Sequence, residues 1–347
     1  MRRRPRPDRR PDSASVRPRT STPALTTDRP AADRGRIVAA LLAVWLLWGS
    51  TFLGIRVVVQ EVPPLFAAGV RFTAAGALLL GGLCWHWRRR GQPGLAARLR
   101  GHTGRLTLLG LMHFLGANGL VSVASEDLPS AAAGTYFATV PIWVLVMGGR
   151  PRGRDLGAAT VGLAGVALLL GFQPGPLLPS LLVLAAALTW AVAGRIAAAS
   201  AGRGDAAGPV PGAALSSAVQ MLGGGLALLV VSGFAGEWGR LDVGHLHPTV
   251  WLAQLHLVLL GSLVGFLAYT WLVTRVDQRL ASTYSYVNPL VAVALGALVL
   301  GEDLTTATLV GTACLVAAVA WTVRSAARPA APHTSDVPTA PAVPASR

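Results

Sequence analysis

Long apolar stretches alternate with short polar connectors through most of this chain. A helix needs about 20 mostly apolar residues to cross a lipid bilayer, and these stretches are close to that length. The pattern predicts ten membrane-spanning helices, at approximately residues 37–57, 64–86, 106–125, 130–149, 155–172, 178–199, 212–233, 249–273, 280–300 and 305–323. The fifth and sixth are the least distinct, since only the short segment 173–179 separates them, and three consecutive glycines weaken the seventh.

The composition agrees with a membrane protein. Hydrophobic residues make up 52% of the chain and charged residues only 13%, whereas soluble domains carry about 25% charge. The net charge of +15 would suit a nucleic-acid partner, but the basic residues lie in tails and connectors and form no folded basic face. The sequence therefore predicts no nucleic-acid partner.

The distribution of arginine predicts the orientation of the helices. All basic residues are arginine, a bias that suggests a GC-rich bacterial genome. If the N-terminus lies inside, nearly all connector arginines fall on the cytoplasmic side, Arg240 excepted, and the external connectors carry acids such as Glu61, Glu126 and Glu237. This asymmetry follows the positive-inside rule. We expect a multi-pass protein of the bacterial cytoplasmic membrane with both termini cytoplasmic, and with tail arginines near anionic lipid.

The sequence contains no recognisable catalytic or cofactor motif. It has no lysine for a Gly-rich phosphate loop and no Gly-x-Ser-x-Gly elbow. Cys84 and Cys314 stand in apolar stretches, without CxxC or Cys/His spacing. The sequence therefore predicts neither an enzyme nor a bound cofactor or metal.

An internal repeat indicates the architecture. A Thr-Tyr pair ending at Tyr136 is followed by Pro141, and a second pair ending at Tyr284 is followed by Pro289 at the same distance. Val-Gly pairs recur in the fifth and tenth predicted helices, and tryptophans recur in the first and sixth. Because each half would contain five helices, the second half enters the membrane in the opposite sense, as in many secondary transporters.

These patterns divide the chain into four parts. The repeats occupy residues 37–172 and 178–323. Residues 1–36 and 324–347 are rich in Pro, Ala, Ser and Arg and poor in large apolar groups. Such tails cannot bury enough surface to offset the entropy of ordering, so we expect them to be disordered. The predicted fold is all-α and membrane-integral, with ten helices in two inverted five-helix repeats.

The ordered set of short motifs resembles the EamA-type family of drug/metabolite transporters. The matching segments are 48–52 (WGSTF), 63–64 (PP), 71–72 (RF), 117–121 (ANGLV), 138–141 (ATVP), 284–289 (YSYVNP) and 300–302 (LGE). The resemblance covers about residues 37–323 and implies a ten-helix fold, a central cavity between the halves and, mostly, export of metabolites. Many family members have Gly-Glu after the proline-bearing helix of both repeats, whereas the first repeat here has Gly-Gly-Arg at 148–150.

Polar residues inside the apolar stretches are candidate cavity residues, because a polar group facing lipid is costly. Two roles are open to Arg71: it binds a substrate carboxylate, or it pairs with Glu61 or Glu126. Asn118 and Asn288 form interhelical hydrogen bonds or line a cavity. Asn288 precedes Pro289, which frees a backbone carbonyl on the preceding turn.

Aromatic and amide side chains complete the candidate cavity. Trp48 and Trp190 occupy matched places, where they flank a ligand or lie at the membrane interface. Tyr284 and Tyr286 are two residues apart and so face different sides of a helix; one is expected to line the cavity. The full set is Trp48, Arg71, Asn118, Tyr136, Trp190, Gln220, Tyr284 and Asn288, with Pro141 and Pro289 as hinges.

The sequence thus favours a secondary transporter that exports small organic solutes, such as amino-acid-like metabolites or drugs, by alternating access. The same fold would also serve an importer or an exchanger. A non-transporting membrane scaffold is the alternative from another class, and the polar set above argues against it. Coupling to protons or to a counter-solute is open; the apolar stretches contain no evident embedded Asp or Glu. Oligomeric state is not encoded in these patterns.

Overall fold

The structure is a computed structural model and describes residues 31–128, 130–148, 153–169, 176–201, 211–300 and 306–327. The first half contains α1 (Ala31–Val59), α2 (Pro64–Arg89), α3 (Leu95–Leu99), α4 (Thr103–Gly110), the π-helical η1 (Leu111–Gly119), α5 (Leu120–Ala124), α6 (Ser130–Phe137), α7 (Val140–Met147) and α8 (Gly153–Leu169). The second contains α9 (Leu177–Ala201), α10 (Ala213–Phe234), the 3-10 turns η2 (Glu237–Arg240) and η3 (Val243–His245), α11 (Pro248–His256), the π-helical η4 (Leu257–Val264), α12 (Gly265–Leu272), α13 (Gln278–Ala281), α14 (Tyr284–Leu300) and α15 (Thr306–Ala327).

The described part of each predicted apolar stretch is mostly helical, and the described residues contain no strand. Within the described ranges, six stretches are long and apolar enough to cross a membrane: Asp33–Val59, Pro64–Arg89, Thr103–Ala124, Leu177–Ser200, Ala213–Phe234 and Pro248–Leu272. Of the other predicted spans, 130–149 coincides with the separate helices α6 and α7, 155–172 and 280–300 overlap the 17-residue helices α8 and α14, and 305–323 coincides with the 22-residue α15. Pro141 lies in the first turn of α7, just after the break at Ala138 and Thr139, and Pro289 lies inside α14.

Both predicted tails differ from the structure at their inner ends. α1 begins at Ala31 and α15 continues to Ala327, so parts of 1–36 and 324–347 are helical. A helix that leaves lipid can continue into water while its polar side chains are solvated, as the exposed Arg34 and Arg36 are here. Residues 1–30 and 328–347, where disorder was expected, lie outside the described residues.

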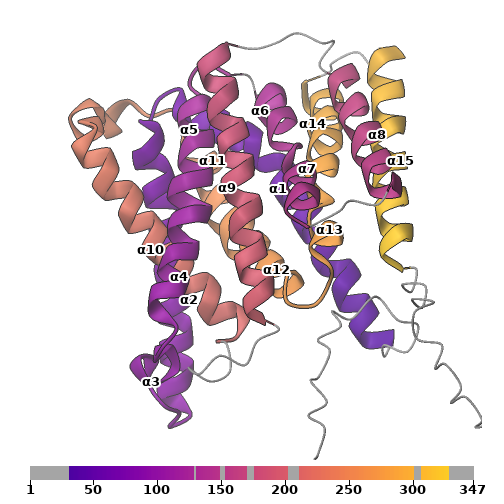
Figure 1. Ribbon diagram of the computed structural model, residues 1–347. Coiled ribbons are helices and arrows are strands. Elements are labelled where there is room, and N and C mark those ends of the chain that lie inside the picture. The colour runs from indigo at the N-terminus through magenta and orange to yellow at the C-terminus, as the bar shows by residue number, and fades with distance from the viewer. Residues whose placement is uncertain are drawn as a thin grey trace, which may run out of the picture.

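The helices pack in pairs that join the two halves of the chain. α2 packs along α10, α1 along α14, and α8 along α15. The last pair, α8 and α15, lies at the right edge of Figure 1. The first residues of α1 and the last of α15 lie toward the lower side of that view, as does α3. Most buried apolar side chains form one cluster, and Ala138, Val166, Tyr286 and Leu315 form a smaller one.

A buried carboxylate holds the start of α2. Glu237, only 3% exposed, accepts hydrogen bonds from the backbone N–H groups of Leu65 (3.3 Å) and Phe66 (2.8 Å) and from the Ser232 hydroxyl (2.8 Å). The first N–H groups of a helix have no partner within the helix and favour a negative charge. Glu237 therefore ties α10 and η2 to α2.

We expect Glu237→Ala to lower the free energy of unfolding by about 1–3 kcal/mol, because it leaves buried N–H groups without an acceptor. Chemical unfolding in detergent micelles, followed by tryptophan fluorescence, measures this loss. Glu61→Ala is the matched control: Glu61 is exposed and accepts one bond, from the His247 N–H at 2.8 Å. Equal effects of the two variants would contradict a capping role for Glu237.

Candidate functional site

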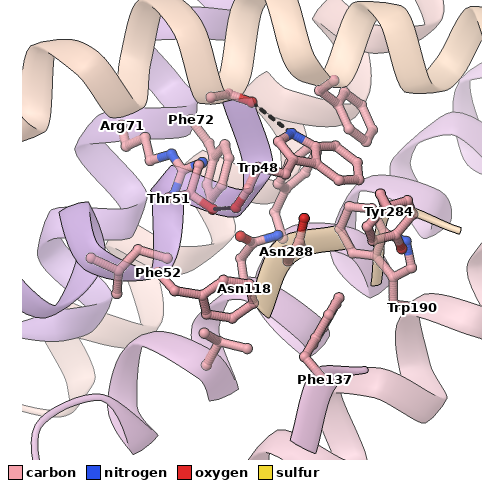
Figure 2. Close-up of a pocket in the computed structure, with 15 residues that line it drawn as sticks. Trp48, Thr51, Phe52, Arg71, Phe72, Asn118, Phe137, Trp190, Tyr284 and Asn288 are labelled. Carbon is pink, nitrogen blue, oxygen red and sulfur yellow. Dashed lines mark hydrogen bonds between the residues drawn. The ribbon is translucent and has the colours of Figure 1, made fainter. Parts of the chain in front are cut away.

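One pocket lies at the centre of the helix pairs. It contains about 510 Å³ of space not filled by atoms, a volume that includes space open to solvent. The lining residues are Trp48, Thr51, Phe52, Ile55, Arg71, Phe72, Phe114, Asn118, Val121, Phe137, Trp190, Gly261, Phe266, Tyr284 and Asn288. They come from both halves of the chain, and Figure 2 shows the labelled ones around the cavity.

Arg71 is the charged residue of the lining. It is 5% exposed, its Nε donates to the Ser262 hydroxyl at 2.8 Å, and its guanidinium lies over the Phe72 ring at 4.5 Å. Neither acid considered as its partner forms a recorded ion pair with Arg71: the Glu61 carboxylate accepts a hydrogen bond from the His247 N–H, and Glu126 contacts Arg56 through its backbone carbonyl oxygen. Arg71 therefore lines the pocket without an ion pair to either acid, and binding of a substrate carboxylate stays a prediction.

Gly261 makes room for this arginine. A Cβ there would lie 3.1 Å from an Arg71 terminal nitrogen and 2.8 Å from the Thr51 methyl group. The Gly261 carbonyl oxygen also accepts a hydrogen bond from Trp48 Nε1 at 2.9 Å. This bond, drawn in Figure 2, fixes the orientation of the Trp48 ring at the pocket wall.

Two asparagines lie between Arg71 and Trp190 in the view of Figure 2. Asn118 donates its amide N–H to the His113 carbonyl at 2.8 Å, within the π-helical segment η1, where wide helical turns redirect backbone carbonyls. Asn288 is 3% exposed, and its Oδ1 is buried without a hydrogen-bond partner. A buried polar atom without a partner is costly, so this position suits a ligand.

Aromatic rings form one wall of the pocket. Trp48 contacts Trp190 and Tyr284 edge-to-face, at 5.2 Å and 4.9 Å between ring centroids, and Tyr269 at 5.1 Å with the rings tilted. Edge-to-face packing of this kind stabilises a fixed ring arrangement. Of the paired tyrosines, Tyr284 lines the pocket, whereas Tyr286 packs in the smaller apolar cluster.

Six of the eight predicted cavity residues line the pocket, and Tyr136 and Gln220 do not. Gln220 lies behind it: its Oε1 is 3.0 Å from His113 Nδ1, and the His113 ring contacts Trp190 at 4.6 Å. Tyr136 is half-buried against the main apolar cluster. Gln220 and Tyr136 lie outside the pocket because helix packing, rather than the polarity of a side chain, decides which helix face meets the pocket.

Residues that the sequence did not single out complete the lining. They are Thr51, Phe52, Ile55, Phe72, Phe114, Val121, Phe137, Gly261 and Phe266. All but Thr51 and Gly261 are ordinary apolar residues of apolar helices, which carry no signal that separates a cavity wall from a lipid-facing side. The available signal is the set of family-like motifs, in which Thr51 and Phe52 belong to 48–52 (WGSTF), Phe72 to 71–72 (RF) and Val121 to 117–121 (ANGLV).

The two ends of the pocket differ. Beyond Trp48 and Tyr284, the Trp45 indole N–H donates to the Thr283 hydroxyl at 3.2 Å, and Arg279 of α13 pairs with the buried Asp155 of α8 at 2.9 Å. At the opposite end a smaller pocket shares Ile55 and Arg71 and continues along α1 to Val58 and Val59.

Near that second end lies Glu126, an exposed residue whose carboxyl group is partly buried by its surroundings. This burial raises the pKa of its carboxyl group, and the charge of Arg240 opposes the rise. Among the described residues no group of three His, Cys, Asp or Glu side chains could hold a metal ion.

Comparisons with known proteins match both halves of the chain to one family model. The model of the EamA-like transporter family matches residues 35–171 and again residues 177–324. The uncharacterized inner membrane transporter YedA of Escherichia coli (strain K12) is 34% identical over 280 residues, 77% of this chain and 84% of that protein. The uncharacterized transporter YcxC of Bacillus subtilis (strain 168) is 25% identical over 296 residues, 81% and 90% of the two chains. A solved crystal structure, 21% identical, has a similar fold, with a TM-score of 0.67 over 85% of this chain and 99% of the other.

Proposed function

This chain belongs to the EamA-like transporter family, and from that premise we propose that it exports small organic metabolites across the bacterial cytoplasmic membrane by alternating access. The observation that carries the proposal is the central pocket, where a buried arginine, an unpartnered asparagine and aromatic rings meet from both family-matched segments. Ligand sites of this composition, apolar walls with a few placed polar groups, are typical of small-molecule binding.

We further propose that the chain has ten spanning helices in two inverted repeats, 37–172 and 178–323. The two matches to the family model support two homologous halves. Each half spanning the membrane five times would place the halves in opposite senses, and a site at their interface then opens to each side in turn. The arginine-rich connectors support cytoplasmic termini.

The geometry of the pocket supports a state that opens toward the external face. The smaller pocket continues from Ile55 and Arg71 toward the C-terminal end of α1, which is external in the proposed orientation. The cytoplasmic end is blocked by Trp48 and Tyr284, with the Asp155–Arg279 pair beyond them. In the cycle we propose, a solute enters when this block opens and leaves past Ile55 after it closes.

The test is a comparison of metabolites in medium and cytosol for a bacterial strain that lacks its own exporters and expresses this chain. We expect one solute class to accumulate outside, and Arg71→Ala or Asn288→Ala to reduce this export at least tenfold, because each removes a polar group of the pocket. Arg100→Ala, an exposed variant outside the pocket, is the control for expression and loss of charge.

Other outcomes would change the proposal. If nothing moves outward and uptake of a solute rises, the protein is an importer. If nothing moves in either direction although the chain is inserted in the membrane, the protein is not a transporter of the solutes measured by metabolite profiling, and the scaffold alternative gains support. Observation of six or eight spans by cysteine accessibility would contradict the ten-helix architecture.

A further inference from the structure

We propose that the pocket selects a small organic carboxylate with an apolar, ring-sized body, in preference to neutral, cationic or zwitterionic solutes. The inference rests on the proposed transport function, since it names the chemical class of the solute, but it can be tested by binding alone.

The first argument is the charge balance of the pocket. Arg71 is the charged member of its lining, and no acidic residue accompanies it. Its recorded hydrogen bond, to the Ser262 hydroxyl, is neutral, and no ion pair of Arg71 occurs among the described residues. A buried cation requires a counter-charge or water. The free protein offers Arg71 no counter-charge in the pocket, and an anionic ligand would supply one.

The second argument is the geometry of the guanidinium. Arginine has five N–H donors in a planar fork, and Nε is the donor used by Ser262. The terminal nitrogens remain for a ligand, and a carboxylate accepts two parallel hydrogen bonds from such a fork. The space next to one of these nitrogens is kept by Gly261, where any side chain would crowd the arginine.

The third argument is the set of buried polar atoms across the pocket. Trp190 Nε1, the Tyr284 hydroxyl and Asn288 Oδ1 all lack a hydrogen-bond partner, and Figure 2 places Trp190 and Tyr284 on the side away from Arg71. The indole and the phenol supply N–H and O–H donors, and none of the three groups carries a negative charge. A ligand with neutral acceptors at its far end would satisfy the indole and the phenol, whereas Asn288 Oδ1 would accept from a ligand donor.

The same balance excludes a ligand ammonium group. In an α-amino acid the ammonium is bonded to the carbon that bears the carboxylate, so it would lie close to Arg71 with no acid to offset the repulsion. An amine without a carboxylate would meet Arg71 directly. The remaining walls, Phe52, Phe72, Phe114, Phe137 and Phe266, are apolar rings that suit an aromatic or branched body.

The experiment measures binding to the purified chain in detergent, by isothermal titration, with four probes of nearly the same size. These are 3-phenylpropanoate, its neutral amide, 3-phenylpropylamine and L-phenylalanine. We expect 3-phenylpropanoate to bind at least tenfold more tightly than each of the other three. Tighter binding of the amide, the amine or the amino acid would overturn the inference, as would chloride competing as well as the carboxylate.

Variants then assign the selectivity to Arg71. Arg71→Gln should weaken binding of 3-phenylpropanoate at least tenfold and leave the amide within about twofold, while Arg71→Lys should retain part of the preference because it keeps the charge without the fork. Arg100→Gln, an exposed position outside the pocket, is the control. Equal losses for acid and amide in Arg71→Gln would indicate a structural defect instead, and would count against the inference.

Transport assays separate this inference from the proposed function. If 3-phenylpropanoate binds through Arg71 but does not exchange across proteoliposomes, the site assignment stands and the transport proposal fails. If the vesicles transport neutral or zwitterionic solutes, and Arg71→Gln leaves that transport unchanged, the transport proposal stands and the carboxylate inference fails.

Discussion

A Gly224→Ala/Gly225→Ala double variant is expected to unfold far more easily than the natural chain, whereas Gly223→Ala, one residue earlier in the same glycine run, is expected to behave normally. A Cβ at Gly225 would lie 2.5 Å from the Thr73 backbone nitrogen of α2, and a Cβ at Gly224 would meet the Gly110 carbonyl oxygen of α4. Nothing lies within 4 Å of a Cβ at Gly223.

The expected loss in the free energy of unfolding depends on which atoms must move to make room for the two methyl groups. The obstructing atoms are backbone, so the helices themselves must separate; overpacking a tight interface costs about 1–3 kcal/mol per site, or roughly 2–6 kcal/mol for both. Gly223→Ala improves helix propensity by up to about 1 kcal/mol. Unfolding curves of the purified proteins in detergent, with the folded yield from size-exclusion chromatography, measure both changes. Normal unfolding of the double variant would mean that α2, α4 and α10 do not pack this closely.

This interface shows where sequence reasoning was weak. The glycine run lowered the expectation of a spanning helix at 212–233, because glycine is a poor helix former. In the structure α10 is continuous from Ala213 to Phe234, and its glycines lie where the backbone of α2 and α4 comes closest. Small residues at helix contacts in membranes permit such approach, and a hydropathy pattern does not contain this information.

The polar part of the pocket was easier to predict than its apolar part. Arg71, Asn118 and Asn288 stand out in apolar stretches because each is costly in lipid, and all three line the pocket. Gln220 stands out equally, yet it bonds His113 behind the pocket. Polarity predicts that a side chain turns inward, but not which interior space it reaches.

Buried acids outside the apolar stretches could not be predicted either. Glu237 was expected to be an external connector residue, and Asp155 begins the fifth predicted helix next to arginines. The structure buries both, one at the start of α2 and one against Arg279. Apart from Ser232 and Arg240, the partners of these two acids are at least 120 residues away in the sequence. No local sequence pattern therefore predicts that the acids are buried.

The Asp155–Arg279 pair leads to the second large effect we expect. The pair joins α8 of the first half to α13 of the second, with the Asp155 side chain 6% exposed and the Arg279 side chain 32% exposed. Gln278, the neighbour of Arg279, also donates to the Ala191 carbonyl of α9 at 3.2 Å. α13 ends just before Tyr284, so these contacts also hold Tyr284, the residue that we propose closes the cytoplasmic end of the pocket.

Asp155→Asn or Arg279→Gln should therefore favour the state that opens at the α13 end. Removing one partner of a buried pair leaves an uncompensated charge, and a shift of about 1.4 kcal/mol between two states changes their ratio tenfold. The reporter is a cysteine in place of Ser285, which is fully buried and lacks a partner for its hydroxyl, in a chain whose Cys84 and Cys314 are replaced by serine and alanine.

In inside-out membrane vesicles, we expect an impermeant maleimide to label this cysteine about tenfold faster in either single variant than in the natural pair. The charge-swapped Asp155→Arg/Arg279→Asp chain is the decisive control, because it restores attraction between the same two positions. Slow labelling in the swapped chain together with fast labelling in both single variants would assign the effect to the pair itself. Equally slow labelling in all four chains would show that Asp155 and Arg279 do not control access, and the closure of the pocket would then depend on the rings of Trp48, Trp190, Tyr269 and Tyr284 alone.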